Sequence, residues 1–186
     1  VNSGKYKKLD EKLEWKMYEY AHNYLLKRGF EHYEISNWAT PGNKSIHNQI
    51  YWNGKNYIGL GPAAHSYYHN IRRWNKPDLM GYIKNLKAGH VPPSDQEKID
   101  LNKSRLESLF LSLRTDSGIK ISTLSQLYNL PENSIKTLLT DNFTDYPEKL
   151  IRLEQNMLKL TLRGWFLSNS LIAEISSLLD KSNKGV

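Results

Sequence analysis

Residues 30–38 read FEHYEISNW, a run whose aromatic and β-branched side chains are typical of a β-strand. The run follows directly on residues 9–28, where apolar side chains recur at three- and four-residue spacing until Gly29 ends the pattern, which predicts an amphipathic helix. Residues 57–61, YIGLG, predict a second short strand that leads into a loop at residues 62–65. Helix, strand, loop and strand in this order indicate the end of an α/β barrel or sheet, with a site at the C-terminal ends of its strands.

The chain changes character at residues 91–93, VPP, so we place a boundary there between a domain of residues 1–90 and a domain of residues 91–186. Residues 94–97, SDQE, match a helix capping box, and an apolar helical stripe follows as far as Leu113.

The rest of the second domain alternates short elements with clear end signals. Two short helices are expected after Gly118, followed by a β-hairpin over residues 150–160 that turns at Gln155-Asn156. Thr161 is placed to cap a final helix. Three helices, a hairpin and a closing helix give a winged-helix-like, mostly helical domain.

Composition excludes several classes of protein. The 186 residues are 39% hydrophobic and 24% charged, within the globular range, and no apolar run reaches the roughly 20 residues of a membrane helix. Cysteine is absent, which excludes a disulfide scaffold, a thiolate zinc site, an iron–sulfur cluster held by this chain and a cysteine nucleophile. The chain starts at Val1 without a methionine or an apolar leader, so we expect a fragment of a longer protein in the cytoplasm.

The net charge of +7 is unevenly distributed. Residues 1–90 hold 14 basic and 7 acidic side chains, whereas residues 91–186 hold 12 of each. Phosphate contacts need clustered Lys and Arg, so the neutral second half argues against a winged-helix protein that binds nucleic acid, which is the alternative from another functional class.

One segment between the predicted strands combines ligand and aromatic chemistry. Residues 45–52 read SIHNQIYW, and His47 offers an imidazole beside the amide of Asn48 and the rings of Tyr51 and Trp52. Imidazole is a common axial ligand of haem iron, and aromatic rings bury area against a flat apolar ligand. The alternative is that His47 only bonds a loop while Tyr51 and Trp52 fill the core.

Other polar groups suit weaker hypotheses. Gly59 and Gly61 at a strand end allow close approach of a ligand, although the tight-turn interpretation is equally open and the segment lacks a phosphate-loop lysine. His65 and His69 would share a metal if they lay on a helix, but no third ligand accompanies them. Glu34 near a strand end would contact a ribose or an amine, or pair with a surface lysine. Neither hydrolase nor zinc-protease motifs occur.

Several motifs, taken in order, resemble the radical-SAM family of coproporphyrinogen oxidase-like proteins, and in particular its haem chaperone branch. The resemblance covers nearly the whole chain. The residues that carry it are YEISNWA-x-PG from Tyr33, S-x-HN-x-x-YW from Ser45, YIGLGP-x-AHS from Tyr57, LRT-x-x-GI from Leu113, and LT-x-x-G with LSN from Leu160 and Leu167.

The resemblance implies a fold and a set of ligands. The first 90 residues would hold the last helix and strand units of a partial α/β radical-SAM barrel with a connecting segment, before the C-terminal domain. His47 would ligate haem iron, with Asn48, Tyr51 and Trp52 also at the haem. Glu34, Gly59, Gly61 and His65 would lie near S-adenosyl-L-methionine (SAM). The cysteines for a four-iron four-sulfur cluster would lie outside this chain.

The resemblance therefore implies a haem chaperone that delivers haem to apo-haemoproteins. An oxygen-independent coproporphyrinogen III oxidase of porphyrin biosynthesis is the alternative within the family, and the His-Asn-x-x-Tyr-Trp motif favours the chaperone. This chain alone is expected to be catalytically inactive. We also expect self-association of surfaces that the longer protein would cover, and no binding of nucleic acid.

Overall fold

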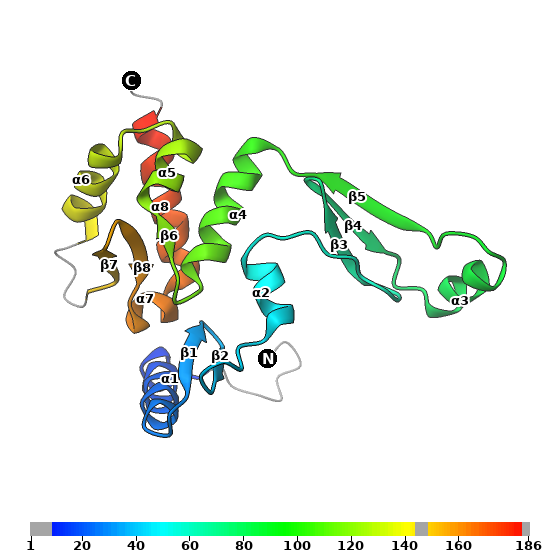
Figure 1. Ribbon diagram of the computed structural model, residues 1–186, viewed down its shortest axis with the longest axis horizontal. Coiled ribbons are helices and arrows are strands. Elements are labelled where there is room, and N and C mark those ends of the chain that lie inside the picture. The colour runs from blue at the N-terminus through cyan, green and yellow to red at the C-terminus, as the bar shows by residue number, and fades with distance from the viewer. Residues whose placement is uncertain (1–8, 144–148, 184–186) are drawn as a thin grey trace. The chain divides into compact units, whose positions relative to one another are not determined.

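The computed structural model describes residues 9–143 and 149–183 (Figure 1). The chain divides into two compact units, described here separately. Unit 1 comprises Val1–Ser45 with Ser112–Val186, and unit 2 comprises Ile46–Leu111. The boundary predicted between residues 90 and 91 falls inside unit 2.

Unit 1 opens with the predicted helix, α1 (Glu11–Leu26). Asp10 caps it, because the carboxylate accepts hydrogen bonds from the amides of Lys12 at 2.9 Å and Leu13 at 3.3 Å. Gly29 then reverses the chain at a φ of +80°, a conformation open to glycine.

The single strand predicted over residues 30–38 is wrong, because this segment is a hairpin of β1 (Glu31–Glu34) and β2 (Asn37–Ala39). The turn bonds to groups outside the hairpin: the Tyr18 hydroxyl donates to the Ile35 carbonyl at 2.8 Å, and the Ile35 amide donates to the Arg114 carbonyl at 2.9 Å. Strand propensity depends on neighbouring residues only, so it does not predict hydrogen bonds to partners this far away in the sequence.

The rest of unit 1 contains the winged-helix-like pattern. In chain order its elements are β6 (Ile119–Lys120), α5 (Ile121–Tyr128), α6 (Glu132–Phe143), β7 (Ile151–Glu154) and β8 (Met157–Leu160). The sheet is antiparallel with the order β6-β8-β7. The predicted turn is confirmed: Gln155 and Asn156 have φ values of +49° and +63°, the left-handed pair that a two-residue hairpin needs.

The predicted final helix is two helices, α7 (Leu162–Phe166) and α8 (Ser168–Asn183), which meet at Leu167. The predicted cap is confirmed, since the Thr161 hydroxyl accepts from the Gly164 amide at 3.1 Å.

The core of unit 1 lies among α5, α6, α8 and β8, which Figure 1 shows gathered around the small sheet. The buried side chains come at helical spacing from each helix and from alternate positions of β8. The apolar ones are Ile121, Leu124, Tyr128, Ile135, Leu139, Phe143, Leu158, Leu160, Leu171, Ile172, Ile175 and Leu179.

Unit 2 contains α2 (Ile46–Trp52), β3 (His65–Tyr68), β4 (Ile71–Asn75), α3 (Leu79–Lys87), β5 (Ser94–Lys98) and most of α4 (Leu101–Leu113), whose last two residues belong to unit 1. Its strands form an antiparallel sheet in the order β3-β4-β5. Among the described residues, all strand pairings are therefore antiparallel and no closed barrel forms.

Two local predictions in unit 2 are wrong. Residues 94–97 are not a capping box but the body of β5, which pairs with β4 from Asn75↔Ser94 to Ile71↔Lys98. The helix begins later, at Leu101, where the Asp100 carboxylate accepts from the Lys103 amide at 2.9 Å. Residues 57–61 are not a strand either, because only Tyr57 bridges to Tyr67.

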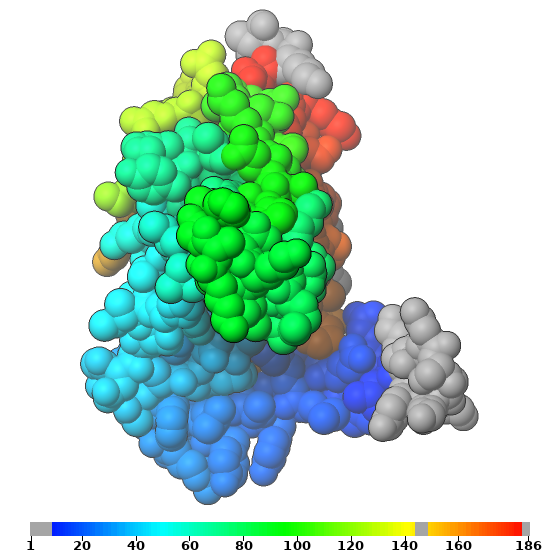
Figure 2. All heavy atoms as spheres, turned by 90° about the vertical axis from the view of Figure 1, so that its right-hand side faces the viewer, coloured from blue at the N-terminus to red at the C-terminus, as the bar shows by residue number. Residues whose placement is uncertain are grey.

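Unit 2 has little interior. None of residues 46–98 is fully buried, and the apolar side chains of α3 are exposed (Leu79, Met80, Ile83 and Leu86). In Figure 2 the end of this unit that holds α3 faces the viewer. Of the helices that the structure describes, none combines the length and apolar character needed to cross a membrane.

Candidate functional site

The predicted haem-binding residues all lie on α2, a helix of two turns. His47 and Tyr51 are one turn apart on one face, and Asn48 and Trp52 repeat that spacing on the next row. The helix ends at Trp52, and Gly54 follows in the turn with a φ of +58°, its amide bonded to the Tyr51 carbonyl at 3.0 Å. The structure thus brings the four residues together on one element.

His47 and Tyr51 are in direct contact. The Tyr51 hydroxyl oxygen Oη lies 3.0 Å from Nε2 of His47, and the two rings are perpendicular, with centroids 4.9 Å apart. His47 is exposed and Tyr51 is half-buried. The imidazole is therefore open to solvent, while one of its nitrogens bonds to the phenol.

Two further tyrosines extend this aromatic surface. Tyr57 packs edge-on against Tyr51 with ring centroids 4.5 Å apart, and Tyr67 follows at 6.4 Å from Tyr57. Reciprocal backbone hydrogen bonds of 2.9 Å between Tyr57 and Tyr67 fix the pair. Burial raises the pKa of Tyr57, so it stays a neutral phenol at physiological pH. The sequence analysis did not assign either tyrosine to the site, although Tyr57 begins one of its quoted motifs.

A cavity of about 330 Å³ lies beside Tyr51 within unit 2. The charged side chains on its wall pair with one another: the Arg72 guanidinium bonds the carboxylates of Glu97 at 2.9 Å and Glu107 at 2.8 Å. The lining residues are Tyr51, Asn53, Gly54, Lys55, Tyr57, Tyr67, Arg72, Ser104, Glu107, Ser108 and Leu111. The cavity thus joins a phenolic wall to a satisfied ion-pair network.

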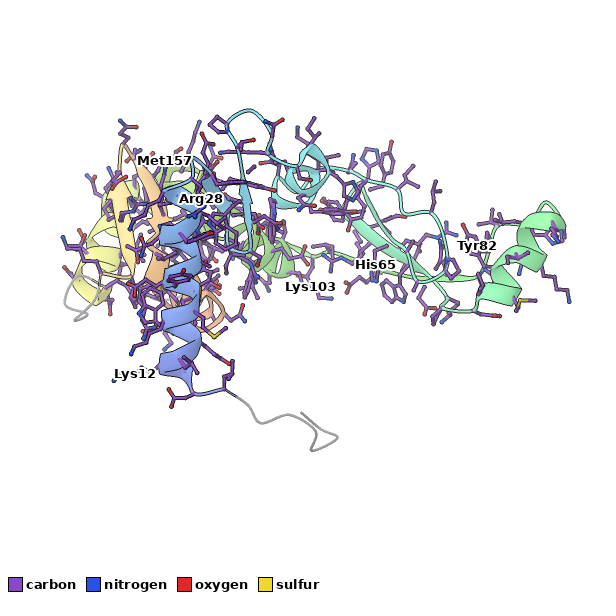
Figure 3. All side chains as sticks on the ribbon, turned by 90° about the horizontal axis from the view of Figure 1, so that it is seen from below. Lys12, Arg28, His65, Tyr82, Lys103 and Met157 are labelled. Atoms are coloured by element: carbon purple, nitrogen blue, oxygen red, sulfur yellow. The ribbon has the colours of Figure 1, made fainter. Side chains whose placement is uncertain are left out.

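In the glycine loop predicted to approach SAM, two backbone amides are already hydrogen-bonded to side chains of the same chain. The Gly59 amide donates to the Ser66 hydroxyl, and the Gly61 amide donates to the Tyr82 hydroxyl, both at 3.0 Å. A β-carbon on Gly59 would collide with the His65 carbonyl, so this glycine is needed for close packing. Figure 3 labels His65 at the start of β3 and Tyr82 on α3.

Glu34 is at the end of β1 in unit 1, whereas Gly59, Gly61 and His65 are in unit 2. The Glu34 side chain has no exposed surface; one carboxylate oxygen accepts a hydrogen bond from the Asn37 amide, and the other, Oε2, has no hydrogen-bond partner among the described residues. Its backbone bridges to Thr115, just after α4. The structure therefore gives Glu34 a role in joining two segments of unit 1, and its predicted contact with SAM stays a prediction.

The metal site considered for His65 and His69 required both residues to lie on one helix, and they do not. The two residues lie in the β3–β4 hairpin, and His69 occupies its turn with a φ of +49°, so they do not share a helix face. His65 instead stacks on Trp74, with ring centroids 5.9 Å apart. Across residues 9–143 and 149–183, no cluster of three or more His, Asp or Glu side chains is arranged to hold a metal ion.

A histidine pair in unit 1 was missed by the sequence analysis. His22 of α1 and His32 of β1 approach through their Nδ1 atoms at 2.9 Å, and His32 stacks on Trp38 at 4.1 Å between ring centroids. The pair lines a cavity of about 400 Å³ with Asp116, Arg152 and Trp165, among others. Ten residues separate the two histidines, and no local periodicity links them.

No family model matches the chain. Curated relatives do. The chain is 32% identical over 169 residues to the Heme chaperone HemW of Lactococcus lactis, which covers 90% of this chain and 42% of that protein. It is 31% identical over 157 residues to the Heme chaperone HemW of Bacillus subtilis, covering 84% and 41%.

The Radical S-adenosyl methionine domain-containing protein 1, mitochondrial, of Bos taurus is 28% identical over 193 residues, covering 96% of this chain and 41% of that protein. The chain is similar to members of the radical-SAM family that contains the haem chaperones. The predicted family is thereby confirmed, and the chain spans about two fifths of the length of these radical-SAM relatives.

A solved structure supports the radical-SAM fold. The coproporphyrinogen III oxidase (HemN) of Escherichia coli, a radical SAM enzyme, superposes with a TM-score of 0.58 at 15% identity, over 87% of this chain and 39% of that one. The predicted fold class, the C-terminal part of a partial radical-SAM α/β barrel followed by a small winged-helix-like domain, is confirmed.

Radical-SAM family membership implies SAM and a four-iron four-sulfur cluster. The chain holds no cysteine, so its residues do not fit the cluster. Haem fits α2 better, because an imidazole, a phenol and an aromatic surface lie together there.

Proposed function

We propose that this chain carries the haem-binding surface of a radical-SAM haem chaperone, with haem held on α2 and passed to apo-haemoproteins. The observation that supports it is the exposed imidazole of His47 next to the Tyr51, Tyr57 and Tyr67 rings. A neutral imidazole ligates haem iron, and the aromatic surface favours the flat porphyrin over water. Haem here is cargo and not a catalytic group.

The proposal assigns distinct roles on α2. In the ferrous complex His47 supplies the axial nitrogen, while Tyr51 and Trp52 contact the ring or its edge. Asn48 would hydrogen-bond at the same surface. In the intact protein, SAM and the cluster would be held elsewhere with cysteines from outside this chain, and we propose that the protein acts in the cytoplasm.

Ferrous haem is the sharpest probe, because iron(II) favours a neutral nitrogen ligand. We expect His47→Ala to bind dithionite-reduced haem at least about tenfold more weakly than the wild type, as followed by the Soret band. His90→Ala is the matched control, since His90 is another exposed histidine of unit 2, and it should bind like the wild type. Equal affinity and identical spectra for wild type and His47→Ala would refute the assignment.

The solved structure that resembles the chain is a coproporphyrinogen oxidase, which makes porphyrin chemistry without iron the second candidate. A metal-free porphyrin separates the two functions, because it offers no iron to His47. A site built for haem should lose affinity for ferrous haem on His47→Ala and keep its affinity for the metal-free porphyrin. A site built for an iron-free porphyrin should bind metal-free porphyrin equally well before and after the substitution, and bind haem no better.

A further inference from the structure

The nitrogen that the proposed haem site needs is already engaged. Nε2 of His47 lies 3.0 Å from the Tyr51 hydroxyl, and the perpendicular rings direct the imidazole edge at that oxygen. Tyr51 is braced on its other side by Tyr57, at 4.5 Å between ring centroids. An iron atom that approaches this face therefore meets two potential ligand atoms only 3.0 Å apart, from residues one helical turn apart.

The two atoms are alternatives for one iron position. The axial sites of a haem lie on opposite faces of the porphyrin, so its two axial ligands are separated by the ring itself. Atoms 3.0 Å apart on the same helix face cannot lie on both sides of a porphyrin. Whichever atom binds iron, the other remains on the same face as a hydrogen-bond partner.

Ligand chemistry distinguishes the two. Both tyrosine and histidine serve as axial ligands of haem proteins. Oxygen donors suit harder metal ions, and imidazole suits softer ones. Ferric iron is the harder state and favours an anionic phenolate, whereas ferrous iron favours the neutral imidazole.

We propose that Tyr51 is the axial ligand of ferric haem and His47 that of ferrous haem, so that α2 exchanges ligands with the oxidation state of its cargo. The proposal rests on haem binding at α2, as proposed above. In the ferric complex the Tyr51 oxygen bonds iron and its proton moves to Nε2 of His47. When a one-electron donor reduces the iron, the iron–oxygen bond breaks, the proton returns to the phenolate, and Nε2 bonds the iron.

The exchange would give the carrier two different affinities for haem, one for each oxidation state of the iron, on one short helix. A phenolate holds iron only while it is ferric, so reduction releases that bond without moving the helix. The His47 to Tyr51 spacing of one turn, together with the brace from Tyr57, keeps both ligands within reach throughout.

The test compares ferric and dithionite-reduced haem on the 186-residue chain by resonance Raman and absorption spectroscopy. In the wild type we expect an iron–tyrosinate vibration in the ferric state and a histidine-ligated spectrum in the ferrous state. Tyr51→Phe keeps the ring against Tyr57 but should lose the tyrosinate vibration and leave the ferrous spectrum unchanged. His47→Ala should keep the tyrosinate vibration and change the ferrous spectrum.

Tyr68→Phe is the matched control, because Tyr68 is an exposed tyrosine of the same unit on β3, and all its spectra should match the wild type. Identical ferric spectra for Tyr51→Phe and wild type, with haem bound in both, would overturn the ligand exchange and leave the haem-binding function standing. If the wild type bound haem in neither oxidation state, the proposed function would be refuted, and the ligand exchange with it.

Discussion

His22 and His32 face each other through their Nδ1 atoms at 2.9 Å, so one ring must donate and the other accept. Nε2 of His32 also contacts the Ile35 carbonyl at 3.4 Å, and a proton on that nitrogen leaves Nδ1 of His32 as the acceptor. The pair needs at least one neutral ring, because two protonated rings would turn two donors toward each other. Burial, with the neighbouring His22 as a smaller cause, lowers the pKa of His32 to about 4.

This pair predicts a loss of stability in mild acid. The unfolded chain binds a proton at His32 near the ordinary pKa of 6.5, whereas the folded chain does not until about pH 4. The free energy of unfolding should therefore fall as pH drops from about 6.5 to about 4, by at most about 1.4 kcal/mol per pH unit from this group. The nearby Asp116 carboxylate opposes part of this lowering, because it favours the protonated ring.

Urea unfolding at a series of pH values checks this prediction, and NMR titration of the His32 ring measures its pKa directly. His32→Phe should flatten the slope between pH 6.5 and 4, because the unfolded state then has no proton to gain at this site. His90→Gln, an exposed control, should leave the slope unchanged. A His32 pKa near 6.5 in the folded chain would contradict the prediction.

Gly118 is needed for both its conformation and its space. Its φ is +68°, and a β-carbon there would collide with the Leu158 carbonyl of β8. We expect Gly118→Ala to lower the free energy of unfolding by about 2 kcal/mol or more, since left-handed strain alone costs about 1 kcal/mol. Gly29→Ala is the matched control: its φ is +80°, but its β-carbon would meet nothing within 4 Å. Equal urea midpoints for the two variants would show that the collision does not matter.

Residues 46–98 should open more readily than the helices of unit 1. No residue in this range is fully buried, whereas α5, α6 and α8 each bury side chains at helical spacing. Local opening is easiest where few apolar contacts hold the backbone. Amide hydrogen exchange should therefore be faster in β3, β4 and α3 than in α5 and α8. Equal protection of the amides in both units would indicate that another surface covers unit 2. Sedimentation at several concentrations would show whether a second copy of the chain provides that surface.

Sequence patterns whose structural effect is confined to neighbouring residues predicted the structure correctly. Asn156 after Gln155 gave the hairpin turn, and Thr161 gave a helix cap, because each residue bonds or bends its own neighbourhood. The motif around His47 was identified without its structure, since residues 46–52 form helix α2 and no helix was predicted there.

Signals that depend on distant partners failed. The capping-box pattern from Ser94 to Glu97 is a strand because β4 offers it a hydrogen-bonding edge. The turn at Ile35 is set by Tyr18 and Arg114, which lie 17 and 79 positions away. Neither the His22–His32 pair nor the complete burial of Glu34 has a local signal, because both follow from how α1 and the segment after α4 pack on β1.

The winged-helix-like part should not bind DNA. The helix that would enter a groove, α6, carries Lys136 as its single cation, against Glu132 and Asp141. The hairpin turn is tied to the same helix, because the Asn156 amide donates to the Glu132 carboxylate at 2.9 Å. Phosphate binding gains its free energy from the release of counterions by several clustered cations, and this surface does not supply them.

Fluorescence anisotropy with a labelled duplex across salt concentrations tests this on the whole chain, whose first half carries the net charge of +7. We expect Lys136→Glu to leave both the affinity and the salt slope unchanged. The matched charge reversals Lys84→Glu and Lys87→Glu on α3 should weaken any residual non-specific binding, since they lie in the basic half. A Lys136→Glu variant that bound less tightly, with a salt slope smaller by about 1, would show that α6 contacts phosphate and would revive the nucleic-acid hypothesis.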